Sequence, residues 1–378
     1  MKVPRLAALA GLLALGASSV AAVTTAVTAS ADIPWYGPKT VVMTTCSLPA
    51  NTSNTSAPPV ITASGDSGGS IYGFASCRTN VPGAIYFFMT KGGHSIHQAT
   101  PYRGSLEVAA TDGTGAVYLV YSVRTSTDTS VYIARRSAQG AYSPSALLTH
   151  TVGRFRPSVS LAAANGKWWT VWSEAPGPNR PLFERRTLLG TRARHAITLT
   201  SPRSESWDWT PGLAVEGDLA RLAWITGGDL GNRWAFTQSR PDGVWKTGVL
   251  MSPPGAILRI PPKLVMTGGH VYVAWWYGGG PVYGDDSSGA LRFRKLAAPA
   301  FTPYLAVSGG VSTIAENATG DVVASPYLHI DELRSGVWSS ANWPTVDSMD
   351  SVLSNGGRAT FVMHKSTSPV VYLLTETS

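Results

Sequence analysis

The 378-residue chain has few of the residues that mark many common classes of site. It contains two cysteines, and charged residues make up only 14% of it. It has no glycine-rich phosphate loop, which argues against the nucleotide-binding enzymes that depend on one. Helical periodicity of the apolar residues is absent throughout. The sequence therefore predicts an all-β protein.

Long apolar stretches are also absent after the first 31 residues. Lys2 and Arg5 precede an apolar stretch over residues 6–23, and Ala29-Ser30-Ala31 offers a small-x-small cleavage site. This pattern predicts a secretory signal peptide over 1–31, followed by one exported domain over 32–378 without a membrane span. In an oxidising compartment, Cys46 and Cys77 are expected to form a disulfide that pins the N-terminal segment.

A pattern repeated about every 50 residues fills the mature chain. Each unit has a small apolar strand, a Gly/Asp/Asn turn and a second strand that ends in an aromatic residue, as in 156–173 and 262–275. Tyr121, Trp172, Trp224 and Trp275 occupy one position of the repeat and are spaced 51, 52 and 51 residues apart. Two further strands complete each clear unit. Four strands in about 50 residues are typical of a β-propeller blade.

The number of repeats predicts the number of blades. First strands are expected near Pro59, Ser105, Pro157, Pro211, Pro262, Gly310 and Ala359. The sequence thus predicts a single seven-bladed β-propeller of four-stranded antiparallel blades, with six blades as the alternative. The last repeat supplies strands only at 359–364 and 370–375, whereas the strand at 39–45 has no blade of its own. We expect this N-terminal strand to close the ring and remove an exposed sheet edge, which leaves one strand of that blade unassigned.

The charge balance indicates the kind of partner. The formal net charge is +8, and it would fall to +6 when the leader is removed with Lys2 and Arg5. A basic exported protein either resists aggregation or prefers anionic partners such as uronic or sialic acids, teichoic acids or nucleic acid. No Lys/Arg-rich tail or nucleic-acid motif is present, so nucleic acid is the weakest choice. We expect an extracellular glycan or anionic polysaccharide as partner, and a monomer.

At the turns after the third strands, the chain resembles the sialidase-like and lectin-like propellers. Their Asp-box is in essence Ser-x-Asp-x-Gly-x-x-Trp, and Ser239-Arg-Pro-Asp242-Gly243-Val-Trp245 is a near match with altered spacing. The turns at 137–142 and 335–338 are more degenerate. The resemblance implies a propeller over most of the mature chain. Because Asp-boxes of that family lie away from the catalytic face, these turns carry no information about chemistry.

Residues that flank the first two strands of each unit are expected to converge on the mouth of a central funnel. Guanidinium groups there would bind carboxylates in bidentate fashion, as the resemblance to sialidases implies for sialic acid. Arg259-Ile-Pro looks like the Arg-Ile-Pro of that family, although here it opens the fifth repeat. The candidate ligand-binding residues are Arg103, Arg154, Arg156, Trp207, Trp209, Arg259, Trp276 and Arg358.

Hydrolysis of a glycoside would need an acid and a nucleophile or base. Glu174, Asp208 and Asp229 are the candidate acids and Glu205 the candidate base, while Tyr277 or Tyr304 offers a phenol. A solvated loop carboxylate or a salt-bridge partner of an arginine is the alternative role for each acid. No metal or cofactor is expected, and calcium at Asp285-Asp286 is the alternative.

These patterns favour an exported carbohydrate-binding, lectin-like propeller, with acidic sugars as candidate ligands. A sialidase-like exo-glycosidase and an extracellular protein-interaction scaffold are the alternatives, because a propeller fold alone does not choose between binding and catalysis. Whether the protein is an enzyme therefore stays open at the level of sequence. The large aromatic residues of the repeat, Trp168, Trp169, Trp172, Trp224 and Trp275, are expected to fill the wedges between blades rather than to contact a ligand.

Overall fold

A computed structural model describes the strands of the chain and the best-defined connections between them. Side chains are described chiefly within 69–76, 83–91, 94–152 and 159–172. The described backbone covers 40–43, 60–65, 69–76, 83–91, 94–152, 158–173, 182–187, 197–198, 207–216, 219–227, 233–238, 249–250, 263–267, 270–277, 290–296, 311–316, 322–326, 329–334, 337–342, 348–355, 358–364 and 371–375.

All described elements are β-strands, and they pair in antiparallel sheets; all but the last sheet consist of consecutive strands. The first sheet contains β2 (Val60–Gly65), β3 (Ile71–Ser76), β4 (Ala84–Lys91) and β5 (His94–Arg103); the second contains β6 (Ser105–Thr111), β7 (Val117–Arg124), β8 (Asp128–Arg136) and β9 (Ala146–Val152). The third contains β10 (Ser158–Ala164), β11 (Lys167–Ser173), β12 (Leu182–Thr187) and β13 (Ile197–Thr198); the fourth contains β14 (Trp207–Glu216), β15 (Leu219–Gly227), β16 (Arg233–Gln238) and β17 (Val249–Leu250).

The remaining strands form three more sheets. The fifth sheet has three described strands, β18 (Lys263–Thr267), β19 (His270–Tyr277) and β20 (Ala290–Leu296). The sixth contains β21 (Val311–Glu316), β22 (Val322–Pro326), β23 (His329–Arg334) and β24 (Val337–Asn342). The last has the order β1-β27-β26-β25, with β1 (Thr40–Met43), β25 (Ser348–Asn355), β26 (Arg358–His364) and β27 (Val371–Thr375). Among the residues described, there is no helix long and apolar enough to cross a bilayer.

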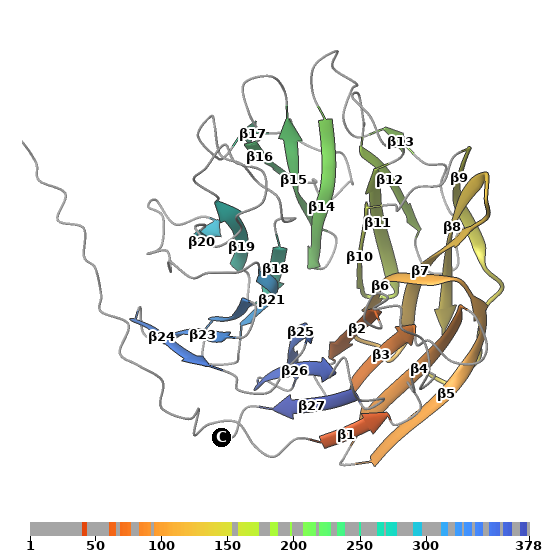
Figure 1. The fold of residues 1–378 in the computed structure, drawn as a ribbon, viewed down its shortest axis with the longest axis horizontal. Coiled ribbons are helices and arrows are strands. Elements are labelled where there is room, and N and C mark those ends of the chain that lie inside the picture. Colours follow the sequence, from red (N-terminus) through yellow and green to blue (C-terminus); the bar gives the residue numbers. More distant parts are fainter. Residues whose placement is uncertain are drawn as a thin grey trace, which may run out of the picture.

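The sheets are arranged radially around a common centre (Figure 1). The first strand of each sheet is the innermost, because it contacts the first strands of the sheets on either side; β2, for example, contacts both β6 and β25. Each sheet consequently presents both faces to its neighbours. This arrangement explains why the inner strands are apolar on both sides.

Large apolar side chains fill the wedges between neighbouring sheets. Phe74 and Phe87 of the first sheet pack against Leu119 and Tyr121 of the second. The other face of the second sheet packs on Leu161 and Trp168 of the third sheet, and Trp169 contacts the fourth sheet through Leu222 and Trp224. Burial of each such side chain stabilises the fold by roughly 1.5–3 kcal/mol. The expectation that the repeated aromatics fill wedges is confirmed for Tyr121, Trp172 and Trp224, which are buried.

The last sheet corrects the predicted strand boundaries of the seventh repeat. The strand expected near Ala359 is the second strand of its sheet, and β25 is the first. The segment Ser-Met-Asp-Ser-Val-Leu-Ser-Asn is polar enough that the apolar pattern missed it. The N-terminal strand β1 pairs with β27, with Thr40 opposite Leu373.

Candidate functional site

The second sheet, β6 to β9, has the most completely described side chains, and one group of its polar residues lies at the end where β6 begins and β7 ends. First strands begin and second strands end at this edge of each sheet, which we call the mouth end. In the second sheet it carries the start of β6, the end of β7, the turn at 125–127 and the end of β9. The site is built from residues of these four segments.

A β-bulge at the start of β6 directs Glu107 across the sheet. The register of β6 on β7 shifts between Leu106 and Val108, so Glu107 is the extra residue. Its carboxylate accepts a hydrogen bond of 2.6 Å from the Ser122 hydroxyl and an ion-paired one of 2.9 Å from Nη2 of Arg124. Bulges of this kind redirect a side chain at a functional rim.

The Glu107–Arg124 pair lies largely out of solvent. The Glu107 side chain is only 5% exposed and that of Arg124 is 25% exposed. Burial of the carboxylate is compensated by the guanidinium and the Ser122 hydroxyl, because a buried charge without partners would be costly. Nε of Arg124 is also buried, and it has no hydrogen-bond partner in the described part of the chain. The pair supplies a fixed, charge-neutral wall rather than a free acid.

The same bulge recurs on other innermost strands. Register shifts occur between Trp209 and Gly212 in β14, between Val311 and Thr313 in β21, and between Met349 and Ser351 in β25. Each lies near the mouth end of its strand. In β25 the extra residue is also acidic, Asp350.

Arg103 lies at the mouth end between the first and second sheets. It is the last residue of β5, its side chain is exposed, and its Nη1 donates to the carbonyls of Thr100 and Tyr102, both at 2.9 Å. One nitrogen therefore anchors the side chain. Nε and Nη2, the edge of the guanidinium that can grip a carboxylate side-on, have no partner among the described residues.

Gly104 fixes the position of Arg103. Its φ of +147° is rarely adopted by other residues, and a Cβ there would lie 2.4 Å from the Ser122 carbonyl oxygen. Its N–H donates to the Gly83 carbonyl at 2.8 Å. Only glycine allows the chain to pass this closely from the outermost strand of one sheet to the innermost strand of the next.

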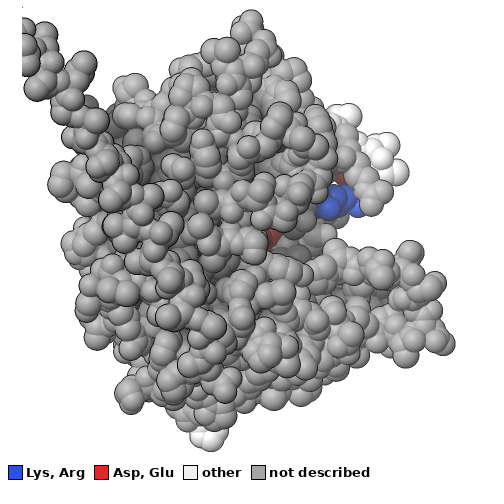
Figure 2. Space-filling view, turned by 60° about the vertical axis from the view of Figure 1, so that its left-hand side comes forward, with Lys and Arg blue, Asp and Glu red and all other residues white. Residues whose placement is uncertain are grey.

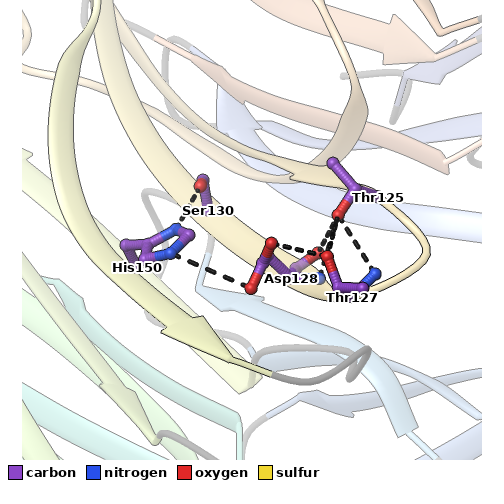
Figure 3. A network of polar contacts seen from close by, with 5 residues as sticks. All are labelled: Thr125, Thr127, Asp128, Ser130 and His150. Carbon is purple, nitrogen blue, oxygen red and sulfur yellow. Dashed lines mark hydrogen bonds and ion pairs between the residues drawn. The ribbon is translucent and has the colours of Figure 1, made fainter.

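A second polar cluster occupies the outer corner of the mouth end (Figure 3). The Ser130 hydroxyl and Nδ1 of His150 share a hydrogen bond of 2.9 Å, and Nε2 of His150 lies 4.0 Å from Oδ1 of Asp128. The Thr127 hydroxyl donates to the other carboxylate oxygen of Asp128 at 2.7 Å. Within the described residues, no three His, Cys, Asp or Glu side chains are grouped to hold a metal ion.

Tyrosines support the mouth from within the wedge between the first and second sheets. Tyr121 stacks on Tyr132 with 5.4 Å between ring centroids, and Tyr102 lies 5.7 Å from Tyr121. Burial raises the pKa of both Tyr102 and Tyr121. Their hydroxyls are engaged, since that of Tyr102 donates to the Ser143 carbonyl at 2.7 Å and that of Tyr121 shares a hydrogen bond with Ser145. These phenols are structural.

The backbone places several of the residues predicted for the site at the mouth end. Arg103 lies there as expected. Trp207, Asp208 and Trp209 were expected before the first strand but form the beginning of β14, because the strand continues beyond the bulge at Thr210–Pro211; Pro211, which lacks an N–H, fits a position outside the regular ladder. Trp276 and Tyr277 were expected in the following loop and instead end β19, opposite Leu291 and Ala290.

Among the candidates that the structure describes, Arg358 is the one that the strand order moves away from the mouth. It begins β26 opposite Asn355, at the hairpin between the first and second strands of the last sheet. That hairpin is at the end opposite the mouth, so the grouping of Arg358 with the other arginines is wrong. The remaining candidates lie outside the described residues: Glu174, Asp229, Glu205, Arg154, Arg156, Arg259, Tyr304, Asp285, Asp286, and the cysteines Cys46 and Cys77.

The sequence offered a signal for two residues that were missed. Arg124 is the last residue of a second strand, three residues after the repeated aromatic Tyr121, and Glu107 is a lone charge near the start of an apolar strand. In Figure 2 a few Lys or Arg atoms of the described residues are exposed beside Asp or Glu atoms. The cluster of Asp128, Ser130 and His150 had no sequence signal, because it depends on the pairing of β8 with β9.

Two solved structures have a similar arrangement. An α-L-arabinofuranosidase from Fusarium graminearum, solved with an iminosugar inhibitor, matches with a TM-score of 0.51 at 12% identity over 84% of this chain and 93% of that chain. The Cps50 (Swd1) β-propeller domain from Myceliophteria thermophila matches with a TM-score of 0.50 at 12% identity over 85% of this chain and 98% of that chain. The chain has a β-propeller fold. Its sheets are accordingly blades.

The similarity of these structures to the chain concerns the fold alone. No family model matches the sequence, and no curated protein matches it. One of the two similar propellers is a glycosidase and the other is described only by its fold. At 12% identity neither transfers a function, so the function has to be argued from the residues at the mouth.

Proposed function

We propose that the protein is an exported, seven-bladed β-propeller, its last blade completed by β1, that binds carbohydrate carrying carboxylate groups. The observation that carries this proposal is the geometry of Arg103. Its guanidinium is anchored through Nη1, while the Nε–Nη2 edge is exposed at the mouth. A planar fork held in this way is suited to a carboxylate, because little side-chain freedom is lost when the ligand binds.

The surroundings of Arg103 support binding of a sugar acid. Ser105 pairs with Ser122, so Arg103 and Arg124 lie two residues beyond that pair on adjoining segments. The positive formal net charge of the chain favours an anionic polymer. Export, by the leader predicted over 1–31, would bring the protein to extracellular glycans.

Replacement of Arg103 tests the proposal. The secreted form should be applied to a glycan array that includes sialylated and uronic acid-containing sugars, with release of free sugar monitored in parallel. Arg103→Ala should weaken binding of the acidic glycan about ten- to hundredfold, as expected for loss of a charge-assisted bidentate contact. Because the side chain is exposed, stability should hardly change.

Lys91→Ala is the matched control. Lys91 is exposed at the end of β4 away from the mouth, so this variant loses the same charge without touching Arg103. Equal affinity of Arg103→Ala and wild type, or equal losses in both variants, would contradict the proposed contact. Binding without release of sugar supports a lectin.

A sialidase-like glycosidase is the second candidate, favoured by the recurrent bulges. Glu107 and Asp350 are the extra residues of the bulges in β6 and β25, the two strands that flank β2. A glycosidase needs two carboxyl groups roughly 5 to 10 Å apart. Binding ranks first because Arg124 and Ser122 already engage Glu107. Release of free sugar that is abolished by Glu107→Gln would instead establish the enzyme.

A further inference from the structure

Nε2 of His150 and Oδ1 of Asp128 face each other without forming a hydrogen bond. Nε2 of His150 and Oδ1 of Asp128 are 4.0 Å apart, which is beyond hydrogen-bond distance. A single oxygen atom can nevertheless lie about 2.8 Å from both. The gap is therefore the right size for one hydroxyl group that accepts from the imidazole and donates to the carboxylate.

Neighbouring hydroxyls hold both groups in position for this task. Ser130 engages Nδ1 of His150 at 2.9 Å, which fixes the plane of the ring and leaves Nε2 facing Asp128. Thr127 donates to Oδ2 of Asp128, and the backbone N–H of Asp128 donates to the Thr125 hydroxyl at 2.9 Å. Within these contacts Oδ1 of the carboxylate accepts no hydrogen bond (Figure 3).

Apolar side chains flank the gap on the same face of the blade. Val123 is paired with Ser130, which is in turn paired with His150, and Val152 is paired with Asp128. Directly paired residues project to the same face of an antiparallel sheet. Val123 is 38% exposed and Val152 is 82% exposed. The cluster thus offers polar groups for a hydroxyl and apolar side chains for the C–H groups of a sugar ring.

We propose that Asp128 and His150 form a subsite for a neutral sugar residue, with one ring hydroxyl bridging Nε2 and Oδ1 and the C–H groups of the ring resting on Val123 and Val152. This inference rests on the proposed function, since it adds a second sugar of the same glycan to the carboxylate held by Arg103. The subsite lies on β8 and β9, outward of the innermost strand. It would therefore select for chain length rather than for charge.

The test uses the ring signals of histidine in NMR spectra of the mature protein during titration with methyl glycosides of neutral hexoses and pentoses. The His150 signals should shift in a saturable way in the wild type. Asp128→Asn, which keeps the shape but removes the charge, should weaken this binding at least about tenfold, because hydrogen bonds to charged groups are the stronger ones. His97→Ala is the matched control, since His97 is exposed on β5 outside the cluster.

The outcomes separate this inference from the proposed function. No saturable shift of His150 with any glycoside, or equal shifts in the wild type and Asp128→Asn, would overturn the subsite, whatever the acidic-glycan array shows. Saturable shifts lost in Asp128→Asn and kept in His97→Ala would support it even if Arg103→Ala binds acidic glycans normally. Circular dichroism confirms that Asp128→Asn is folded, and Ser130→Ala, which frees the imidazole, should weaken binding less than Asp128→Asn.

Discussion

Substitution of Gly104 by alanine provides the sharpest test of the packing at the mouth. A Cβ at this position would lie 2.4 Å from the Ser122 carbonyl oxygen and 3.0 Å from the ring of Tyr121. The oxygen belongs to the backbone of β7, so it cannot rotate away. The backbone φ of +147° adds strain for any residue with a side chain. Strained backbone costs about 1–3 kcal/mol and overpacking costs a further ~1–3 kcal/mol.

We therefore expect Gly104→Ala to lower the free energy of unfolding by about 2–6 kcal/mol, measured by urea titration. Gly113→Ala is the matched control, because Gly113 also has a positive φ, +79°, but nothing lies within 4 Å of the place that an alanine methyl group would occupy. Its cost should stay near ~1 kcal/mol. If both variants unfold at the same urea concentration, the close approach of Gly104 to β7 described above is refuted. Displacement of Arg103 by the same substitution should also weaken acidic-glycan binding.

Two more predictions concern buried groups of the second blade. Burial raises the pKa of Tyr118 to about 12, and the nearby Asp112 acts in the same direction. The folded protein therefore favours the protonated phenol, and this contribution to stability is complete below pH 10 and is lost between pH 10 and 12. Unfolding free energies measured across this range should fall more steeply for the wild type than for Tyr118→Phe. Arg136 is buried with its guanidinium 4.0 Å from the centre of the Phe87 ring. Arg136→Ala should therefore lower the free energy of unfolding by roughly 2–4 kcal/mol through loss of cation–π and packing contacts. A change below ~0.5 kcal/mol in the same urea assay would show that this contact contributes nothing to stability.

Much of the fold could be predicted because the residues that recur in the sequence are the ones that pack between the blades. The aromatic position shared by Tyr121 and Trp172 is buried in both blades. The turns expected at Asp112-Gly113 and Asn165-Gly166 have the positive φ values that those residues tolerate, +79° at Gly113 and +50° at Asn165. Such features are local, so the sequence displays them directly.

The candidate site was harder to predict because it depends on register. A bulge turns Glu107 toward Arg124, and nothing in the order of residues signals a bulge. Ser130 meets His150 only because β8 and β9 pair in one particular alignment. The polar strand β25 was missed for a similar reason: its residues lack apolar alternation, and it is a strand because it pairs with β26.

The pairing of β1 with β27 has a consequence for how the molecule is made. These two strands are far apart in the sequence. During synthesis, β1 therefore has no partner strand until β27 has been made. Contacts between such distant segments form late, because the loop between them has to be closed first. We therefore expect the β1–β27 pairing to be among the last contacts to form as the chain folds.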